Sequence, residues 1–418
     1  MTTRLLVLTK HFPYNMGETA AESYLETEVA YLARAFDEVL VAATEAPAGC
    51  SPVQILPVNA RSVSLGFVQS KAEKARCLLD GLARRSRPGT HRSGAIHSER
   101  GLRPVEATFQ RYFVGKAARK WDRLTTELDA ANFVPTHIYS FWLYDTALMA
   151  AWAKQQYSCL GAVARAHRYD LYRDSTRSHY LPCREYLLGT LDTILPCSKD
   201  GTEYLSSEWP AYADKVSTAY LGTRELPDRS EEPKGDPIEV VTCSRAVPVK
   251  RLDLVCDAMS LLDSNGLSIH WTHFGDGPDL AQVRERAKGF CSVEASFPGN
   301  VVNHDLLRRY SETHIDLFVN ASSSEGLPIS IMEASGFGVP VLATDVGGTR
   351  EIVEDGVNGR LVPEEVDAWG LAAAIREFWE MSPDELAGYR REARQVWAER
   401  FRTEKNVNVL LNALLDMR

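Results

Sequence analysis

The chain has 418 residues, enough for two or three domains that each bury a core of their own. Hydrophobic residues make up 44% and charged residues 25%, which is ordinary for a globular protein and argues against wholesale disorder or a fibrous repeat. The formal net charge of −9 disfavours nucleic acid as a partner, and no apolar run reaches the roughly 18 residues of a membrane-spanning helix.

Apolar runs of strand length alternate with helical patterns in the first half of the chain, which predicts an α/β fold with a parallel sheet. The opening apolar run is short and ends at Lys10, so we expect a buried strand and no signal peptide. The expected strands are Arg4–Thr9, Glu38–Ala43, His137–Ser140, Gly161–Ala166, Thr193–Cys197 and Val216–Tyr220, with helices at Ala21–Ala35 and Thr146–Gln156.

A basic segment stands apart at residues 71–103. It holds nine Lys and Arg against three Asp and Glu, a local net charge of +6 in an acidic chain. Pro88, Gly89 and Gly94 favour a solvated loop between helices. The alternative is a patch that contacts anionic lipid headgroups or a phosphate-bearing acceptor, each basic side chain contributing up to about 1 kcal/mol near a charged surface.

The polar, proline-rich segment Pro227–Pro237 predicts a linker, after which the alternation restarts as a second doubly wound domain. Pro383–Met417 reads as helix and is long enough to cross back and brace the first domain. The expected limits are 1–226 for the first domain, 227–237 for the linker, 238–395 for the second domain and 396–418 for a C-terminal helix. The expected strands of the second domain are Ile238–Cys243, Ser268–Phe274, Val293–Phe297, Ile315–Val319, Pro340–Ala343 and Gly359–Val362, with helices at Arg251–Ser264, Asp279–Lys288, Asp305–Glu312 and Pro328–Gly336.

The eight cysteines are scattered, and their spacing does not indicate a metal site. No two form a CxxC pair, and no cysteine–histidine set has the spacing of a zinc site. We therefore expect reduced thiols in a cytoplasmic protein and no bound metal.

The most informative motif is NASSSEGLPISIMEASGFGVPVLAT at residues 320–344. Glu325 lies in a Ser-rich loop before a helix that begins near Pro328, and Glu333 lies about two turns further on. Gly326 lets the backbone approach a ligand, and the first helical turn offers amide groups and a positive dipole to an anion. A phosphate flanked by two carboxylates suits a nucleotide sugar, whereas the alternative is a capped surface helix.

A second motif, TCSRAVPVKRLDLVCDA at residues 242–258, opens the second domain. Ser244 and Arg245 end its first strand, and Lys250 precedes the following helix. Loops at the carboxyl ends of parallel strands line the ligand crevice, so these cations should face the same crevice as the Glu325 loop and neutralise a departing diphosphate. Two solvated basic residues at a helix start are the alternative.

Two further groups of residues follow strand ends. Gly275 lies in a strand–helix turn, FGDGP, that borders the nucleotide site; a lone GxG is weak evidence, and no Walker A sequence is present. In the first domain, His167 follows an apolar run, with Arg165 and Asp170 nearby as acceptor-side candidates. A structural role for the histidine is the alternative.

Together these segments resemble the retaining GT-B glycosyltransferases of glycosyltransferase family 4. The resemblance rests on SRAVPVKRLDLVCDA, FGDGP, FPGNV, ASSSEGLPISIMEASGFGVPVLAT and GGTREIVEDGVNGRLV, which occur in the family's order over residues 238–362. It is looser in the first half, through KHFPYNMGE and RAHRYDLY, and the looser motifs are similar to transferases of bacterial capsule and exopolysaccharide assembly.

The resemblance implies two Rossmann-like domains that face each other across a cleft, with the second holding the nucleotide-sugar donor. Arg245 and Lys250 would then bind the diphosphate, Glu325 the donor sugar and Glu333 the ribose hydroxyls. The backbone at Gly326 and Leu327 would meet the phosphate. No metal would be needed, and this chain shows no DxD sequence.

On the acceptor side, the resemblance gives His167 a role near the donor sugar and the acceptor hydroxyl. It also implies that the loop carrying Gly17 and Glu18 closes on phosphate and acceptor, although a plain strand–helix connection is the alternative there. Ser244-Arg245 and Lys250-Arg251 depart from the Gly-Arg and Lys-Gly pairs common in the family, so the loop backbone is expected to differ.

The expected function is transfer of a sugar from a nucleotide diphosphate to an acceptor hydroxyl in polysaccharide or glycoconjugate biosynthesis, without a cofactor. The expected partners are a nucleotide sugar and a glycan or lipid-linked glycan. Peripheral contact of residues 71–103 with the inner face of an anionic membrane stays the alternative to a solvated loop. Two alternatives remain at this point: a phosphorylase or nucleotide-sugar epimerase on the same scaffold, and a non-catalytic nucleotide-binding assembly protein.

Overall fold

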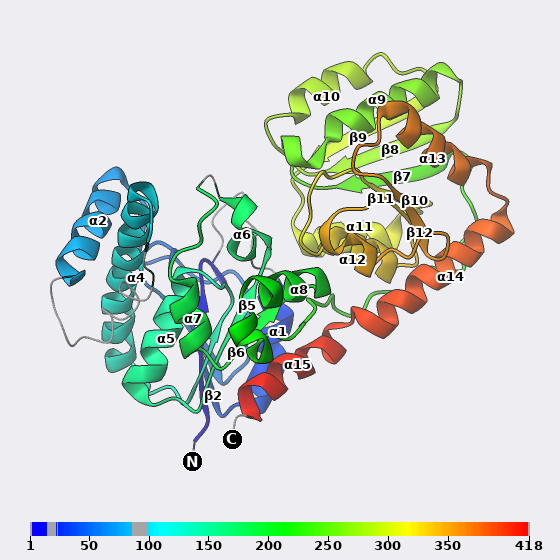
Figure 1. The fold of residues 1–418 in the computed structure, drawn as a ribbon. Coiled ribbons are helices and arrows are strands. Elements are labelled where there is room, and N and C mark those ends of the chain that lie inside the picture. Colours follow the sequence, from blue (N-terminus) through cyan, green and yellow to red (C-terminus); the bar gives the residue numbers. More distant parts are fainter. Residues whose placement is uncertain are drawn as a thin grey trace. The chain divides into compact units, whose positions relative to one another are not determined.

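The computed structural model describes residues 2–14, 22, 24–85, 99, 101–176 and 178–416. The chain forms two compact units (Figure 1). One comprises Met1–Tyr220 with Asn406–Arg418, and the other comprises Leu221–Lys405. The division therefore falls between Tyr220 and Leu221, earlier than the limit expected after Leu226, and the chain end belongs with the first unit.

The first unit is built on a six-stranded parallel sheet in the order β3-β2-β1-β4-β5-β6. Strands β1 and β2 are continuous apolar runs and are almost wholly buried, as expected for a sheet covered on both faces. The strands are β1 (Arg4–Thr9), β2 (Glu38–Ala43), β3 (Ala60–Ser64), β4 (His137–Ser140), β5 (Gly161–Ala166) and β6 (Thr193–Pro196). The helices are α1 (Tyr24–Ala35), α2 (Lys71–Arg85), α4 (Pro104–Ala130), α5 (Asp145–Tyr157), α6 (Arg168–Leu171), α7 (Arg184–Thr190), α8 (Lys199–Glu208) and α15 (Thr403–Leu415).

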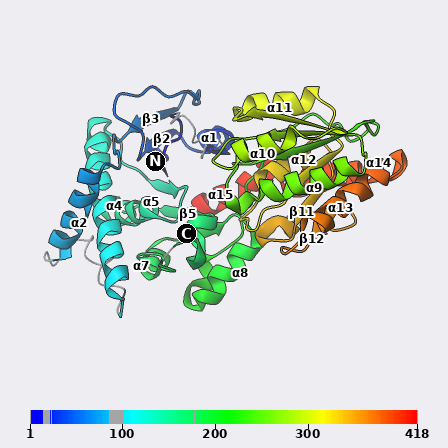
Figure 2. The same cartoon turned by 90° about the horizontal axis from the view of Figure 1, so that it is seen from above.

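The second unit repeats this plan with the order β12-β11-β10-β7-β8-β9, again parallel throughout. Helices α9 and α13 lie side by side over its core (Figure 2). The strands are β7 (Ile238–Cys243), β8 (Ile269–Phe274), β9 (Val293–Gly299), β10 (Leu317–Asn320), β11 (Val341–Thr344) and β12 (Gly359–Val362). The helices are α9 (Leu252–Ser264), α10 (Leu280–Ala287), α11 (Asn303–Glu312), α12 (Ile329–Gly336), α13 (Ala368–Glu380) and α14 (Pro383–Arg400).

The two doubly wound sheets confirm the expected α/β fold class, and four local expectations need correction. Edge strand β3 was not expected, because its sequence ARSVS carries little apolar signal. Val216–Tyr220 is not a regular strand; Val216 forms an isolated bridge with Ile194. The first part of the basic segment is the helix α2 and not a loop. The expected C-terminal helix is broken into α14 and α15 at Phe401–Arg402.

Helices α2 and α4 approach each other closely through two glycines (Figure 1). A Cβ atom added to Gly115 would lie 1.7 Å from the carbonyl oxygen of Cys77, and one added to Gly81 would lie 2.0 Å from the carbonyl oxygen of Arg111. Because both obstacles are backbone atoms, neither can rotate away. The hairpin geometry therefore depends on glycine at these positions.

We expect Gly115→Ala to lower the stability of the first unit by about 1–3 kcal/mol, because the extra methyl group forces the two helices apart. The measurement is the midpoint of thermal unfolding. Gly388→Ala is the matched control, since Gly388 also lies in a helix and its added Cβ would meet nothing within 4 Å. Equal midpoints for the two variants would contradict the close approach.

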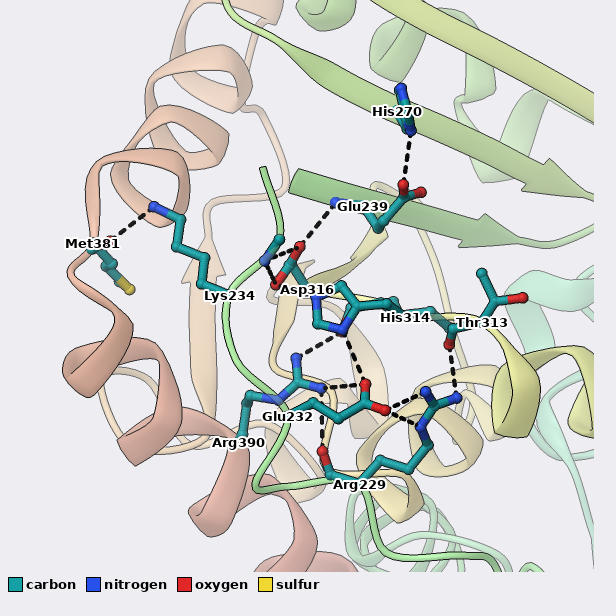
Figure 3. Close-up of polar contacts among 12 residues, drawn as sticks. Arg229, Glu232, Lys234, Glu239, His270, Thr313, His314, Asp316, Met381 and Arg390 are labelled. Carbon is teal, nitrogen blue, oxygen red and sulfur yellow. Dashed lines mark hydrogen bonds and ion pairs between the residues drawn. The ribbon is translucent and has the colours of Figure 1, made fainter. Parts of the chain in front are cut away.

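The segment Pro227–Pro237, expected to be a linker, lies within the second unit and is bonded to it (Figure 3). Arg229 donates hydrogen bonds to the carbonyl oxygens of Tyr310 and Thr313, at 2.7 and 2.8 Å. Lys234 donates to the carbonyl oxygen of Met381, at 2.8 Å. These bonds attach the segment to α11 and to the end of α13.

His314 joins this segment to the sheet (Figure 3). Its Nδ1 lies 2.9 Å from Glu232 and its Nε2 lies 2.8 Å from Asp316, which also accepts from the backbone N–H of Gly235 at 3.1 Å. The hydrogen bond to Asp316 is the largest influence on the pKa of His314; it raises this pKa above its usual value, while burial and Arg390 act in the opposite direction.

Replacing His314 by glutamine should therefore destabilise the protein more at pH 5.5 than at pH 9. A histidine whose pKa is raised on folding contributes stability below its unfolded pKa of about 6.5 and loses that contribution as pH rises through the folded value. Urea unfolding of wild type and variant at both pH values measures the difference. His304→Gln, with a side chain that is 72% exposed, is the control. A pH-independent loss would refute the charged form of His314.

Candidate functional site

The main candidate site lies at the point where the strand order of the second sheet reverses. Strand β7 is first in sequence and has β8 on one side and β10 on the other, so the loops after β7 and β10 diverge from neighbouring strand ends. Ligands of open α/β sheets bind at such switch points. The two motifs that the sequence singles out, residues 244–251 and 321–328, are these two loops.

An ion pair joins the two loops. The Nζ atom of Lys250 lies 2.6 Å from Oε1 of Glu325, whose side chain is only 9% exposed. The same carboxylate oxygen accepts hydrogen bonds from Oγ of Ser322 at 2.6 Å and from Nδ2 of Asn320 at 3.2 Å. Lys250 and Glu325 were both expected at this crevice, but their direct contact was not. The pair fixes both side chains and leaves the second carboxylate oxygen of Glu325 with no hydrogen bond among the described residues.

The backbone around the pair is held by further bonds. The backbone N–H of Ser323 donates to the carbonyl oxygen of Val249 at 2.9 Å, and Thr344 donates from Oγ1 to the carbonyl oxygen of Ser322 at 2.5 Å. Arg251, in a left-handed conformation with φ of 46°, donates from Nε to the carbonyl oxygen of Ala321 at 2.6 Å. Arg251 therefore positions the loop and does not face a ligand.

Two glycines are required by the close approach of neighbouring loops. Gly275 has φ of 136°, and a Cβ there would lie 1.8 Å from the carbonyl oxygen of Ser244. Gly347 has φ of 50°, and its Cβ would lie 2.1 Å from the carbonyl oxygen of Glu325. Both conformations are ones that side chains rarely adopt. The FGDG turn therefore borders the Ser244–Arg245 loop, and the GGT turn supports the Glu325–Gly326 loop.

Two cationic side chains and a helix start belong to the loops at this switch point. Arg245 is exposed, and its guanidinium has no hydrogen bond or ion pair among the described residues. Helix α12 begins at Ile329, separated from Gly326 and Leu327 by Pro328 alone. The first amide groups of a helix have no acceptor within it and are available to an anion. Lys250, Arg245 and these amides together suit a phosphate or diphosphate.

Glu333 lies about one turn into the short helix α12 (Ile329–Gly336) and is 5% exposed. Its Oε1 accepts a hydrogen bond from Nδ2 of Asn303, at 2.6 Å, from the start of α11. Burial raises the pKa of Glu333 to about 7, while the bond from Asn303 and the charge of Arg224 act in the opposite direction. Asn303 was not a predicted site residue, because nothing in its local sequence links it to a glutamate thirty positions away.

In the first unit, His167 lies just after β5 and against two aromatic rings. The centroid of its ring lies 4.7 Å from that of Phe141 and 4.4 Å from that of Trp142. Neither ring nitrogen has a hydrogen-bond partner in the described part of the chain. Burial, and then the charges of Arg165 and Lys10, hold the pKa of His167 well below its usual value, so the imidazole is neutral at neutral pH.

Arg165 and Asp170 are fully buried, which corrects their expected place beside an acceptor. Arg165 is engaged through Glu28 at 2.5 Å, the hydroxyl of Tyr139 at 2.9 Å and the carbonyl oxygen of Ala219. Asp170 accepts from the backbone N–H groups of His167 at 2.6 Å and Leu143 at 2.7 Å. Their geometry fits positioning of His167 and of the loop after β4, not direct contact with a substrate.

The candidate residues Gly17 and Glu18 lie outside the described residues. Glu22, which follows them in the sequence, was not a predicted site residue. Its buried carboxylate accepts a hydrogen bond from Oγ1 of Thr9, at 3.1 Å, and from four further donors that follow β1 and β4. These are the backbone N–H groups of Lys10 at 2.8 Å, His11 at 2.5 Å and Phe12 at 2.8 Å, and Nε1 of Trp142 at 2.5 Å. Glu22 therefore fixes the backbone at the switch point of the first sheet, between β1 and β4.

Two other chemical features are absent from the described part of the chain. Within the described ranges, no group of three or more His, Cys, Asp and Glu side chains is arranged to hold a metal ion. Among those same residues, no helix is both long enough and apolar enough to cross a membrane.

The second unit is similar in sequence to known glycosyltransferases. Residues 223–396 match the family model described as Glycosyl transferases group 1. WcaL of Salmonella typhimurium, which is named for a glycosyltransferase role in colanic acid biosynthesis, is 28% identical over 257 residues. That alignment spans 60% of this chain and 63% of the length of WcaL.

Solved structures share the fold over nearly the whole chain. The crystal structure of Anabaena HepE in complex with UDP covers 98% of this chain and 99% of its own, with a TM-score of 0.66 and 15% identity. Sucrose-phosphate synthase from Thermosynechococcus elongatus covers 98% of both chains, with a TM-score of 0.70 and 16% identity. The fold is therefore GT-B, and the stretch that matches the glycosyl transferases group 1 model, residues 223–396, contains the Lys250–Glu325 pair and α12.

Proposed function

We propose that this protein is a retaining, metal-independent glycosyltransferase. It would move a sugar from a nucleotide diphosphate to a hydroxyl group of a glycan or lipid-linked glycan in polysaccharide or glycoconjugate biosynthesis. The observation that carries the proposal is the Lys250–Glu325 pair beside the start of α12, inside a glycosyl transferases group 1 domain. HepE, which binds UDP, and WcaL, named for polysaccharide synthesis, agree with it.

Different site residues would stabilise the negative and the positive charge that develop during sugar transfer. As the bond from the sugar to the diphosphate breaks, negative charge develops on the leaving group and positive charge on the sugar. Lys250, Arg245 and the amide groups near Gly326 and Leu327 would stabilise the diphosphate, in an arrangement already fixed before the reaction. Glu325 would contact the sugar, and Glu333 would bind the ribose hydroxyls.

The protonation state of His167 fits a role at the acceptor. A neutral imidazole can accept a hydrogen bond from an acceptor hydroxyl, and both ring nitrogens of His167 lack a partner among the described residues. A cationic histidine would instead repel the developing positive charge of the sugar. The retaining outcome and the absence of a metal requirement follow from the sequence resemblance, with the cations of the site taking the part of a metal.

Mass spectrometry of purified protein with a panel of nucleotide sugars and oligosaccharide acceptors tests the function. We expect one donor to give a product heavier by one sugar residue, in the presence of EDTA, with the anomeric configuration of the donor retained by NMR. Consumption of a donor only with inorganic phosphate, or its epimerisation without an acceptor, would replace the proposal by a phosphorylase or an epimerase. Nucleotide binding without turnover of any donor would indicate a non-catalytic protein.

We further propose that α2 holds the enzyme at an anionic membrane surface. Lys71 and Lys74 are exposed at helical spacing with Leu79 and Leu82, which are 64% and 42% exposed. Basic side chains beside exposed leucines on one helix face are typical of helices that lie in a membrane interface. This surface is in the described part of the basic segment.

Neutralising two of these charges should release the protein from vesicles. At about 1 kcal/mol for each lysine, Lys71→Gln with Lys74→Gln should lower partitioning onto phosphatidylglycerol vesicles about 30-fold. Co-sedimentation in low salt measures it. Lys288→Gln, in the second unit with a side chain that is 70% exposed, is the control. Unchanged partitioning of the double variant would exclude α2 as the contact.

A further inference from the structure

A pocket in the first unit lies apart from the candidate site residues, and Glu99 and Leu102, at the end of the basic segment, form part of its lining. It has a volume of about 320 Å³, at the lower end of the range of small-molecule sites. Its walls come from the start of α4, the segment between α6 and α7, the start of α7 and the end of α8. Because all of these belong to the first unit, the pocket exists independently of the donor site in the second unit.

Aromatic side chains form much of its lining. Tyr180, Tyr204 and Trp209 all contribute, and each is only half-buried. The ring of Tyr204 is supported from behind by Tyr172, with ring centroids 4.7 Å apart. Arg173 reaches over Trp209, with Cζ 6.0 Å from the ring centroid. Rings held in this way offer rigid faces to an apolar surface of a ligand, at small loss of conformational entropy.

Polar groups with known partners complete the lining. Arg184 donates to the carbonyl oxygens of Leu143, at 3.3 Å, and Asp170, which fixes its guanidinium. Glu99 accepts from Nε2 of Gln110, at 3.0 Å, and from the hydroxyl of Tyr180. Glu185, at the start of α7, is exposed. Fixed donors and acceptors around aromatic faces are the features that select a ligand carrying many hydroxyl groups.

The charge of the pocket distinguishes between neutral and anionic ligands. Its lining includes three carboxylates, Glu99, Glu106 and Glu185, against the two guanidinium groups of Arg173 and Arg184. Arg173 also pairs with Glu208, at 3.2 Å. This excess of carboxylates disfavours binding of a phosphate or a uronic acid. The hydroxyl groups of a neutral sugar can bond both to carboxylates and to guanidinium groups, and its C–H faces can pack on the aromatic rings.

We propose that this pocket binds a neutral sugar residue of the glycan acceptor, at a subsite separate from the residue that receives the transferred sugar. The proposal rests on the proposed function only in calling the bound glycan an acceptor. Binding of a glycan to the pocket itself needs neither donor nor turnover. Trp209 is the expected specificity residue, since its ring is the largest face in the lining.

Binding is measured on the full-length protein, without nucleotide, by tryptophan fluorescence and isothermal titration with maltotriose, cellotriose, mannotriose and galactotriose. We expect at least one of these trisaccharides to bind saturably. Trp209→Ala should weaken that binding at least about tenfold, and Trp209→Tyr, which keeps an aromatic face, should restore most of it. Trp369→Ala, which removes a tryptophan that is 68% exposed in α13, should leave it unchanged.

The outcomes separate the pocket from the proposed function. Binding of none of the four sugars, equal loss with Trp369→Ala, or unaltered binding in a correctly folded Trp209→Ala variant would overturn the pocket assignment. Tighter binding of glucose 6-phosphate than of the trisaccharides would overturn its neutral character. Failure of the proposed function appears elsewhere, as an absence of nucleotide-sugar binding or turnover, and leaves trisaccharide binding intact.

Discussion

Lys250→Ala is expected to lower kcat by about 10²–10³-fold, the usual effect of removing one fixed group that stabilises developing charge. Lys250 is placed by a single turn of 3-10 helix, Pro248–Lys250, at the switch point of the second sheet. Its ammonium group is held by Glu325 before any ligand arrives, so the enzyme does not reorganise it during the reaction. The substitution removes the positive charge where the leaving diphosphate is proposed to lie.

The same substitution also leaves Glu325 without its cationic partner. The remaining hydrogen bonds from Ser322 and Asn320 keep this carboxylate satisfied, so we expect the variant to fold and to unfold within a few degrees of wild type. Glu325→Gln keeps those two bonds and removes the charge. If the pair acts as one unit, the double variant Lys250→Ala with Glu325→Gln loses much less activity than the sum of the two single losses.

Initial rates with a saturating donor, for both single variants and the double variant, test this expectation. Lys288→Ala is the matched control, because Lys288 is exposed and, among the residues that the structure describes, its ion pair is with Glu285 three positions earlier. Near wild-type kcat in Lys250→Ala, with an unfolding midpoint close to wild type, would rule out this assignment of the leaving-group site. Additive losses in the double variant would show that the two side chains act separately.

Buried strands could be predicted from the sequence, whereas edge strands and close helix contacts could not, because only the former leave a strong apolar pattern. Strands such as RLLVLT and EVLVAA carry an unbroken central apolar run because both faces of a parallel sheet are covered, so they can be predicted from sequence. Strand β3 lies at the edge of its sheet, is half-buried and carries mixed residues, so it leaves little periodic signal. The α2–α4 approach depends on Gly81 and Gly115, which read in sequence as ordinary helix interruptions.

The meeting of two candidate loops was predictable because both follow strands that adjoin at the switch point. Lys250 and Glu325 belong to motifs of this kind, and the parallel order of β7 and β10 brings them together. Asn303 and Glu22 were missed because each acts through a contact with a distant segment, and neither belongs to a local pattern. Arg165 was misplaced because a charged residue at a strand end can point into the core when Glu28 balances it there.

Donor binding is expected to depend on pH through the ionisation of Glu333. We expect the affinity for the donor nucleotide sugar to rise about 30-fold between pH 5.5 and pH 8, if the ribose hydroxyls require the ionised carboxylate. The unliganded pKa of about 7 means that Glu333 is mostly protonated at pH 5.5 and mostly ionised at pH 8. Hydroxyl groups that donate to the carboxylate favour the charged form, so binding lowers this pKa and releases a proton near neutral pH.

The intact nucleotide sugar is the proper ligand for this experiment, because both of its phosphates are esterified and do not titrate in this range, unlike the terminal phosphate of a nucleoside diphosphate. Isothermal titration in buffers of different ionisation enthalpy measures the released proton directly. Glu333→Gln should bind more weakly at pH 8 and show little dependence on pH. Glu294→Gln, with a side chain that is 79% exposed, should behave as wild type.

Substitution of Asn303 tests whether the pKa of Glu333 sets the pH dependence of donor binding. Its hydrogen bond to Glu333 opposes the effect of burial, so Asn303→Ala should raise the pKa of Glu333 further and move the midpoint of the affinity profile to higher pH. A simple loss of structure would weaken binding equally at every pH, whereas a moved midpoint requires that Glu333 titrates. Two outcomes would contradict the assignment of Glu333 to the ribose: an unchanged midpoint in Asn303→Ala, or a pH dependence that persists in Glu333→Gln. Either would show that another group titrates.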